Sequence, residues 1–541
     1  MTGAGHQKGV ETSEAGSRVL AVNFKSRESR TKLRGGYYTP RELARWLVAW
    51  ALGGKRRGAR VLEPGCGDGA FLGPLVEAGA RVTAIELDPV EAAKARSLVR
   101  GVVEGDALSW LESNPGEWDA AVGNPPYIRY QYLDDGPREV AARLCAQSGV
   151  TITKLANAWV PFVVASLARL VAGGRLAMVV PAEIMHVHHA AGLRRLLEHS
   201  SRTLALVHLR DLVFEGALQG VVLLLVEKAA PGEAPCAPSI VEVETVADLP
   251  AKLDVPKREL RRSGRWMWSL LTDDEARVLT RACERFPSFG ELASVDVGIV
   301  TGANDFFVVD RETVERFDLE PWVLPMVGRS EQMRGLRYRP KDHEANERAG
   351  RRVAFLSLSA GTKLSAGLAR YLEEGEKQDL PARYKCRIRE PWWAVPYVWR
   401  APVVLCKRCH AWPRLVLNEA RVYSTDTVYR VKPRVPARDL VGSFTNTVTL
   451  LSAELEGRHY GGGVLELVPS EIERVLVPLA KTSARELAAL DALVRRGELP
   501  LERQDARLLV GVLSKDEILL LRGAWERLRD RRLRKGAPVG G

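Results

Sequence analysis

The residues best suited to chemistry are Asn124, Pro125, Pro126 and Tyr127, which directly follow the apolar run 119–123. An exocyclic amine on a heteroaromatic ring is a poor nucleophile, because its lone pair is delocalised into the ring. The Asn124 side-chain carbonyl and the Pro125 main-chain carbonyl could accept hydrogen bonds from its two N–H groups. The lone pair of the nitrogen would then point at a methyl sulfonium. The prolines stiffen the loop, and a base could stack on the face of Tyr127. The alternative is an Asn-Pro-Pro turn without a function.

A glycine-rich turn lies upstream, in the sequence Glu63-Pro-Gly-Cys-Gly-Asp-Gly-Ala-Phe71. Its glycines alternate at 65, 67 and 69, where the chain must turn tightly and let a ligand approach the backbone. The spacing is not the dinucleotide fingerprint, because the third glycine comes too early. It is not a P-loop, because no Gly-Lys-Ser/Thr follows. The alternative is a glycine-rich turn that binds nothing.

Two acidic residues follow at the ends of the next predicted strands. Glu86 ends the run 82–85, where a carboxylate can accept hydrogen bonds from a ribose diol. Asp106 lies where a third strand should end, and it could accept from an adenine amino group. Each could also be a solvated loop carboxylate, but together and in this order they predict a site for S-adenosylmethionine. The residues assigned to this site from the turn are Glu63, Gly65, Gly67 and Phe71.

Short apolar runs alternate with amphipathic stretches between about residues 36 and 228. The expected buried strands are 60–62, 82–85, 120–122, 176–180, 204–207 and 221–226. The expected helices are 44–52, 90–99, 157–170 and 193–198. This alternation predicts a doubly wound, mostly parallel α/β sheet. Asn124 would then lie at the carboxyl end of a parallel strand, where such folds bind ligands.

These motifs resemble those of the gamma-class DNA adenine-N6 methyltransferases, the TaqI-like group of restriction-modification type. The resembling segments are GGYYTP, EPGCGDGAF, AIELDP, GDAL and NPPY, in the order of that family, and they span about residues 35–230. The resemblance implies a class I methyltransferase sheet and direct methyl transfer from S-adenosylmethionine to N6 of an adenine flipped out of duplex DNA. It also implies further contacts, from Tyr38 and Thr39 at the methionine end, Phe162 on the cofactor's adenine and Phe214 opposite Tyr127 around the flipped base. A buried core position is the alternative for both phenylalanines.

The composition changes after residue 229, where tryptophan and arginine become frequent. Between Arg383 and Arg434 there are twelve Lys and Arg against three Asp and Glu. The interleaved tryptophans are Trp392, Trp393, Trp399 and Trp412. The cationic side chains would neutralise DNA phosphates, and the tryptophan rings could wedge between bases or stack on them. Alternatively, the tryptophans form a hydrophobic core and the arginines form a solvated face. With a weaker resemblance to the same family, this half is expected to be a mixed α/β target-recognition domain that binds duplex DNA.

The composition limits the class of protein. The 541 residues are 46% hydrophobic and 27% charged, with a net charge of +12, which excludes wholesale disorder and allows a polyanionic partner. No apolar run approaches the roughly 20 residues that cross a bilayer, and the polar N-terminus and seven scattered cysteines predict a reduced, cytoplasmic protein. The expected parts are a flexible basic arm (1–34), a methyltransferase domain (35–230), a linker (231–250), a target-recognition domain (251–480) and C-terminal helices (481–541).

The hypothesis is therefore a site-specific methyltransferase that forms N6-methyladenine in a restriction-modification or phage-defence system. A separate restriction endonuclease is a partner that the resemblance implies. One alternative keeps the chemistry but acts on RNA, on protein glutamine or on N4 of cytosine; a second is a DNA-binding specificity protein with a degenerate catalytic domain. No metal is expected, because the pair Cys406 and Cys409 has only His410 nearby as a further ligand. No membrane is expected either, because the apolar runs are too short to cross one.

Overall fold

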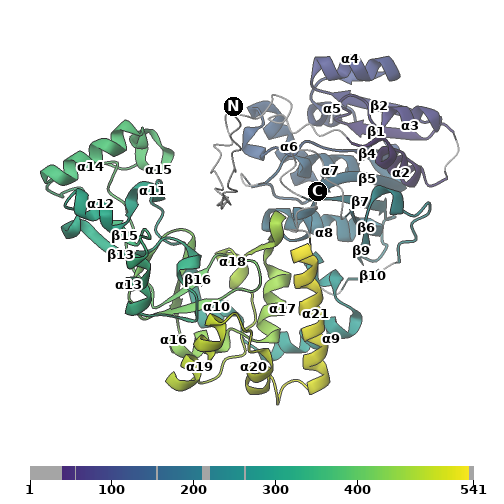
Figure 1. Ribbon diagram of the computed structural model, residues 1–541. Helices are drawn as coiled ribbons and strands as arrows, with labels where there is room; N and C mark the ends of the chain where they lie inside the picture. Colours follow the sequence, from purple (N-terminus) through teal and green to yellow (C-terminus); the bar gives the residue numbers. More distant parts are fainter. Residues whose placement is uncertain are drawn as a thin grey trace, which may run out of the picture.

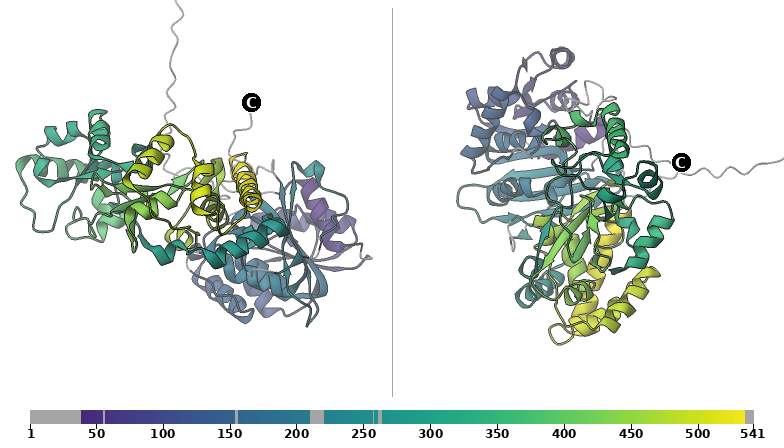
Figure 2. Two further views of the ribbon diagram at one scale, coloured as in Figure 1. Left: turned by 90° about the horizontal axis from the view of Figure 1, so that it is seen from below. Right: turned by 90° about the vertical axis from the view of Figure 1, so that its left-hand side faces the viewer.

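A computed structural model describes residues 39–534, apart from 55–56, 154–155, 210–219, 257 and 261–263. In Figure 1 a layered α/β unit from the N-terminal half lies beside a region of helices and small sheets from the C-terminal half. Seen from below (Figure 2, left), the α/β unit, the yellow C-terminal helices and a green lobe follow one another along the molecule.

An eight-stranded sheet organises the N-terminal half. In spatial order its strands are β3 (Val102–Glu104), β2 (Arg81–Glu86), β1 (Arg60–Pro64), β4 (Trp118–Gly123), β5 (Leu170–Pro181), β7 (Val221–Lys228), β6 (Ser201–Leu209) and β9 (Ser239–Val243). Neighbours are parallel, except that β7 is antiparallel to β5 and β6. The strand order reverses between β1 and β4, and the carboxyl ends at such a switch point form a ligand-binding crevice. All six predicted strands fall inside observed ones, so the mostly parallel sheet is confirmed.

Helices cover both faces of this sheet, because successive strand residues point to opposite sides. They are α2 (Arg41–Leu52), α3 (Leu72–Glu77), α4 (Pro89–Leu98), α5 (Ala107–Ser113), α6 (Asp135–Gln147), α7 (Trp159–Ala168) and α8 (Ala191–Ser200). Val61 and Val122 pack with α2 in one hydrophobic cluster. Leu62 and Ala121 pack with α5, α6 and α7 in another. The sheet therefore separates two cores and is doubly wound, as predicted.

Two predicted boundaries are wrong. The helix predicted for 157–170 ends at Ala168, because Leu170 already pairs with β4. The stretch 231–250, predicted as a linker, contains β9, which pairs in parallel with β6 and extends the sheet. Ile240 and Val241 pack on the two opposite cores, so this stretch is structural. The Ala- and Pro-rich residues ahead of it concealed a strand of only five residues.

The C-terminal half mixes small sheets with helices, as predicted. One sheet has the order β11 (Ala293–Asp296), β20 (Val428–Pro433), β16 (Val403–Cys406), β18 (Leu415–Asn418) and β14 (Arg337–Tyr338). A second has β12 (Val308–Val309), β15 (Ala354–Leu356), β13 (Val323–Val327) and β19 (Tyr423–Ser424). A third has β17 (Arg408–Cys409), β22 (Val464–Glu466) and β21 (Arg458–Tyr460), and β8 (Cys236–Ala237) pairs with β10 (Arg258–Glu259).

The helices of this half surround those sheets. They are α9 (Asp273–Arg285), α10 (Phe289–Leu292), α11 (Asn304–Phe307), α12 (Arg311–Arg316), α13 (Pro340–Arg348), α14 (Ala366–Lys377), α15 (Tyr384–Arg387), α16 (Ala437–Ser443), α17 (Thr447–Glu456), α18 (Pro469–Ile472), α19 (Ala484–Arg495), α20 (Leu501–Leu508) and α21 (Lys515–Arg534). We call α11, α12, α14 and α15 with the second sheet the distal lobe, drawn at the upper left of Figure 1. None of the helices in the described ranges combines the length and apolar character that crossing a bilayer requires.

Helix α21 joins the two halves. Leu521, Trp525 and Leu528 are buried in the same hydrophobic cluster as α5 and α7 of the sheet. Arg531 forms an ion pair with Glu242 on the edge strand β9. The C-terminal half therefore packs on the sheet through a shared core rather than through a loose connection.

Candidate active site

The tetrapeptide Asn124–Tyr127 begins where β4 ends, at the switch point beside β1. Asn124 Nδ2 donates a hydrogen bond to Thr39 Oγ1 at 3.3 Å, and Thr39 lies just ahead of α2. The donor end of the amide is thus turned toward Thr39, and the acceptor Oδ1 is turned away from it. This contact brings together two predicted site residues that are 85 positions apart in the chain.

Tyr127 is held in place as well. Its Oη donates to the carbonyl of Val179 on β5 at 3.1 Å, which fixes the direction of the ring. The chain that follows is tied to the segment before α7, where the amide of Ala158 donates to the carbonyl of Ile128 at 2.8 Å. A loop held at both ends keeps its acceptors in position without reorganisation, as electrostatic catalysis requires.

Asn157 also lies in this region, although no motif in the sequence singles it out. Its backbone forms an isolated bridge with Arg129, two residues after Tyr127. Its Oδ1 is buried and has no hydrogen-bond partner among the described residues. Leaving a buried polar atom unpaired costs about 1–3 kcal/mol, so Asn157 Oδ1 is a candidate acceptor for a bound group. The one sequence signal was its place at the start of a predicted helix, where Asn is a common cap.

The glycine-rich turn after β1 is bonded to the neighbouring strand β2. Gly65 and Gly67 have φ values of +83° and +53°, and the amide of Gly65 donates to the carbonyl of Ile85 at 2.8 Å. Glu86 accepts from the Gly67 amide through one carboxylate oxygen and from the Asp88 amide through the other, both at 2.8 Å. A Cβ atom at Gly67 would meet no atom within 4 Å. The backbone here can therefore be approached closely by a ligand.

Glu63 lies at the base of this turn and is 1% exposed. Neither of its carboxylate oxygens has a hydrogen-bond partner within the described part of the chain. Burial raises its pKa well above the usual value, and the carboxylates of Glu86 and Asp68 raise it further. A buried carboxylate in this setting fits a positively charged ligand group. S-adenosylmethionine carries an ammonium and a sulfonium, so the residues present fit this cofactor.

The two predicted aromatic residues of the cofactor site lie at different places. Phe162 on α7 faces the turn, since a Cβ atom at Gly65 would lie 3.8 Å from its Cε1. Phe71 is 3% exposed and packs in the cluster under α2. The structure thus brings Phe162 to the predicted site and keeps Phe71 in the core.

Asp106 is half-buried at the end of the third strand, as predicted. It caps α5, and its Oδ1 accepts from the Ser109 amide at 2.8 Å and from the Ser109 hydroxyl at 2.7 Å. Both of these bonds use the same oxygen. The remaining predicted site residues, Tyr38 and Phe214, lie outside the described residues.

The basic segment between Arg383 and Arg434 separates into core and surface. Trp392 is buried in the core of the distal lobe, where Trp393 packs beside it, and Trp412 packs on the cluster shared by both halves. For these three tryptophans the core interpretation is the better one. Trp399 instead stacks with cations, 4.2 Å from the Arg430 guanidinium and 4.3 Å from the Lys432 ammonium.

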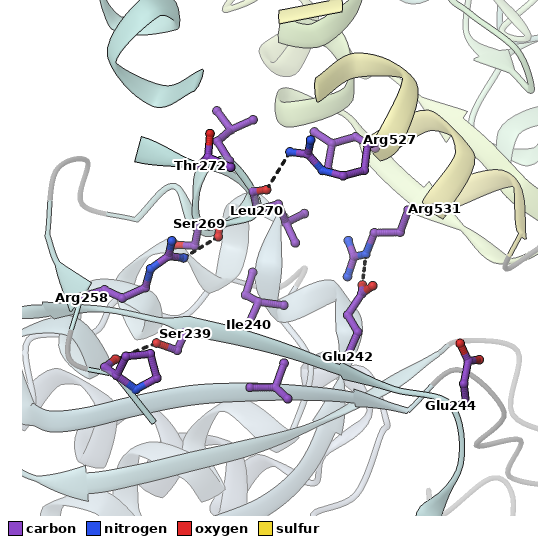
Figure 3. Close-up of a pocket in the computed structure, with 14 residues that line it drawn as sticks. Ser239, Ile240, Glu242, Glu244, Arg258, Ser269, Leu270, Thr272, Arg527 and Arg531 are labelled. Carbon is purple, nitrogen blue, oxygen red and sulfur yellow. Dashed lines mark hydrogen bonds and ion pairs between the residues drawn. The ribbon is translucent and has the colours of Figure 1, made fainter. Parts of the chain in front are cut away.

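A cavity of about 700 Å³ lies away from these residues, between β9 and α21 (Figure 3). Its polar groups pair with one another, as Arg258 does with the Ser269 carbonyl at 2.7 Å and Arg531 with Glu242. None of the predicted site residues lines it. We therefore assign this cavity to the junction of the two halves and not to the active site.

Comparison with known proteins matches each half separately. Residues 89–214 match the family described as Eco57I restriction-modification methylase, and residues 263–509 match the family described as type II methyltransferase M.Eco57I, C-terminal domain. Type II methyltransferase M.XamI of Xanthomonas campestris pv. amaranthicola is 25% identical over 467 residues, covering 83% of this chain and 86% of that protein. Type II methyltransferase M.AccI of Acinetobacter calcoaceticus is 20% identical over 506 residues, covering 89% of this chain and 91% of that protein. The solved structure of the type IIG restriction endonuclease BpuSI has 13% identity and a TM-score of 0.40, covering 93% of this chain and 67% of that one.

The α/β fold and the two matched segments define a methyltransferase of restriction-modification systems. Within this class the chain is a type II DNA methyltransferase, and each half is similar to an Eco57I family. The predicted restriction-modification methyltransferase is thereby confirmed. Its class implies S-adenosylmethionine as the methyl donor.

Proposed function

We propose that the protein methylates N6 of an adenine that is flipped out of duplex DNA. The observation that supports this most is the Asn124–Thr39 hydrogen bond, which ties the Asn-Pro-Pro-Tyr loop at the end of β4 to the segment just ahead of α2. A carboxamide and a main-chain carbonyl in this position can accept the two N–H groups of an exocyclic amine. Since such an amine is paired inside the duplex, the nucleotide must rotate into the site before it can react.

Each residue of the loop has its own task in this proposal. Asn124 Oδ1 and the Pro125 carbonyl accept from the amine, so that its lone pair is directed along the line of transfer. The cofactor supplies an electrophilic methyl group on a sulfonium. Tyr127 offers its face to the flipped base, and its bond to Val179 keeps the ring from turning away. Pro126 stiffens the loop, and Phe214 is proposed on the opposite side of the base.

The cofactor would lie across the carboxyl ends of β1, β2 and β3. Glu63 would accept from its ammonium group, and the open backbone at Gly67 would let it approach the turn. Glu86 would accept from the ribose hydroxyls, because a carboxylate oxygen that already binds one amide keeps a second lone pair. The other residues proposed for this site are Tyr38, Thr39, Gly65, Asp106 and Phe162. Phe71 supports the turn from the core.

The test of this proposal is methyl transfer from labelled S-adenosylmethionine to unmethylated duplex DNA. Asn124→Ala is expected to reduce transfer by roughly 100-fold or more, as removal of one preorganised group does in other enzymes, while cofactor binding persists. The matched control is Asn114→Ala, which removes an amide that donates to the Trp110 carbonyl at the end of α5. If Asn124→Ala and Asn114→Ala methylate DNA equally well, the catalytic assignment is wrong.

A further inference from the structure

Tyr397 projects into solvent from an anchored segment between α15 and β16. The residue is 84% exposed. On one side of it Val395 is buried in the core of the distal lobe, and on the other Val398 packs against the same cluster. The chain on both sides is therefore fixed while the ring between them contacts solvent.

The backbone of Tyr397 has an unusual conformation. Its φ is +60°, in the left-handed region that residues other than glycine rarely adopt. Such strain persists only where the surrounding structure enforces it, and it is concentrated at functional positions. An exposed tyrosine that needed no special orientation would gain nothing from this conformation.

Arg430 enforces the conformation. It is 5% exposed, and its Nη1 donates to the carbonyls of Tyr397 at 2.9 Å and Trp399 at 3.2 Å. Its Nη2 donates to the carbonyl of Val297 at 2.7 Å, which ties the segment to the end of β11. One buried cation thus holds two exposed apolar residues side by side, since Val297 is itself 43% exposed.

Exposed cations lie on the segments that are tied to Tyr397 through Arg430 and Trp399. Arg400, Arg421 and Lys432 are all exposed. Arg400 Nη1 donates to the Arg421 carbonyl at 3.5 Å, and Lys432 lies over Trp399. An exposed aromatic ring on a fixed backbone, with exposed cations on the adjoining segments, suits a polyanion such as duplex DNA, whose flat bases lie between charged phosphates.

We propose that Tyr397 is a wedge that contacts a base of the bound duplex, with Arg400, Arg421 and Lys432 on the neighbouring phosphates. This inference rests on the proposed function in that duplex DNA is the substrate. It places the stacking group on a tyrosine outside the tryptophan pattern, most of which is core. The ring is held by the C-terminal half and is separate from Tyr127, which belongs to the reacting site.

The test uses substitutions that separate the ring from the backbone. Tyr397→Asn removes the ring but keeps a residue that tolerates the left-handed conformation, so its melting temperature should match or exceed that of the wild type. Its affinity for duplex DNA at fixed salt should fall roughly ten- to a hundredfold, as on removal of one stacking ring. Tyr397→Trp keeps a ring and should retain affinity. Leu519→Asn, which removes another exposed apolar side chain from α21, is the control.

Either of two results would overturn the inference. The first is wild-type DNA affinity in Tyr397→Asn, which would mean that this surface serves another partner, such as a protein. The second is an equal loss of DNA affinity in Tyr397→Trp and Tyr397→Asn, since the aromatic ring would then make no contribution to binding. The wedge is tested by the DNA affinity of Tyr397→Asn and the catalysis by methyl transfer in Asn124→Ala, so a failure of the wedge and a failure of the proposed catalysis are distinguishable.

Discussion

Glu63 sets the electrostatics of the proposed cofactor site at the level of single residues. Burial, with Glu86 and Asp68 nearby, holds its pKa well above the ordinary value of 4.5. The folded protein therefore keeps a proton on Glu63 that the unfolded chain has lost, and stability falls as the pH rises from that value toward the folded-state pKa. A cation bound beside Glu63 lowers its pKa again, so cofactor binding should release a proton over the same range.

The first prediction concerns Glu63→Gln. Without an ionisable group, binding of S-adenosylmethionine should release no proton, and the affinity should fall by about tenfold or more, because a hydrogen bond to a charged group contributes about 1.5–3 kcal/mol. The measurement is titration calorimetry near neutral pH in two buffers of different ionisation enthalpy. Glu77→Gln is the control, since Glu77 is exposed on α3 and pairs with Arg45. Buffer-dependent heats that persist in Glu63→Gln would refute this role.

Single residues were predictable where a short motif carried the chemistry. Asn124, Glu86 and Thr39 come from local strings, and the structure brings the first and last of them into contact. Asn157 and Tyr397 belong to no such string. Their significance arises from a buried unpaired atom and from a backbone held by Arg430, which depend on residues distant in the chain.

Among the elements, the turn after β1 must leave room for the cofactor if it binds where we propose. Gly67→Ala should lose about 1–2 kcal/mol of stability, because an L residue is strained at positive φ, and its new Cβ atom would fill the space a ligand needs. Gly497→Ala is a matched control, because Gly497 has a φ of +82° and equally open surroundings, but follows α19. Without S-adenosylmethionine, both variants should show a similar decrease in melting temperature. Adding S-adenosylmethionine should raise the melting temperature only of Gly497→Ala. Equal ligand stabilisation in both would remove Gly67 from the site.

Helix α21 gives a second prediction about an element. Arg532 and Glu454 are each 1% exposed in their side chains and lie 2.7 Å apart. Burial raises the pKa of Glu454, but hydrogen bonds from His459 and Arg532 outweigh it and leave the pKa lowered. Arg532→Met should therefore destabilise the protein by about 3–5 kcal/mol, because the buried Glu454 carboxylate loses its arginine partner and keeps only the contact with His459.

Denaturant unfolding measures this effect. The double variant Glu454→Leu with Arg532→Met should recover much of the loss, since no buried charge remains. Arg277→Met is the control, because its pair with Asp274 is exposed on both sides and such pairs contribute about 1 kcal/mol or less. If the free energy of unfolding falls no more in Arg532→Met than in Arg277→Met, the buried pair on α21 does not stabilise the fold as predicted.

Elements were predictable where burial was continuous. Six of the eight strands of the large sheet are apolar runs between turns, and each of these runs was predicted and lies inside an observed strand. The strand β9 was missed because it is short and follows a Pro-rich stretch. The small sheets of the C-terminal half could not be assembled from sequence, because strands such as β13 and β19 have only five and two residues and pair across a long stretch of chain.

For the molecule as a whole, the net charge of +12 and the basic segment should make DNA binding strongly dependent on salt. With six or more phosphates neutralised, affinity should fall roughly 1,000-fold or more between about 50 and 200 mM salt, while cofactor affinity changes little. Replacing both Arg400 and Lys432 by Gln should lower the slope of log Kd against log salt by about one for each phosphate that is no longer neutralised. Binding that does not respond to salt would mean that the C-terminal half does not follow the phosphate backbone.

Methylation of N6 of adenine in duplex DNA is tested most directly by identifying the methylated nucleoside. Duplex DNA is incubated with the protein and labelled S-adenosylmethionine, digested, and its nucleosides are separated and identified by mass spectrometry. We expect label in N6-methyladenine with the wild type and none above background with Asn124→Ala. Label in N4-methylcytosine, or N6-methyladenine formed equally by the variant, would show that the proposed chemistry is wrong.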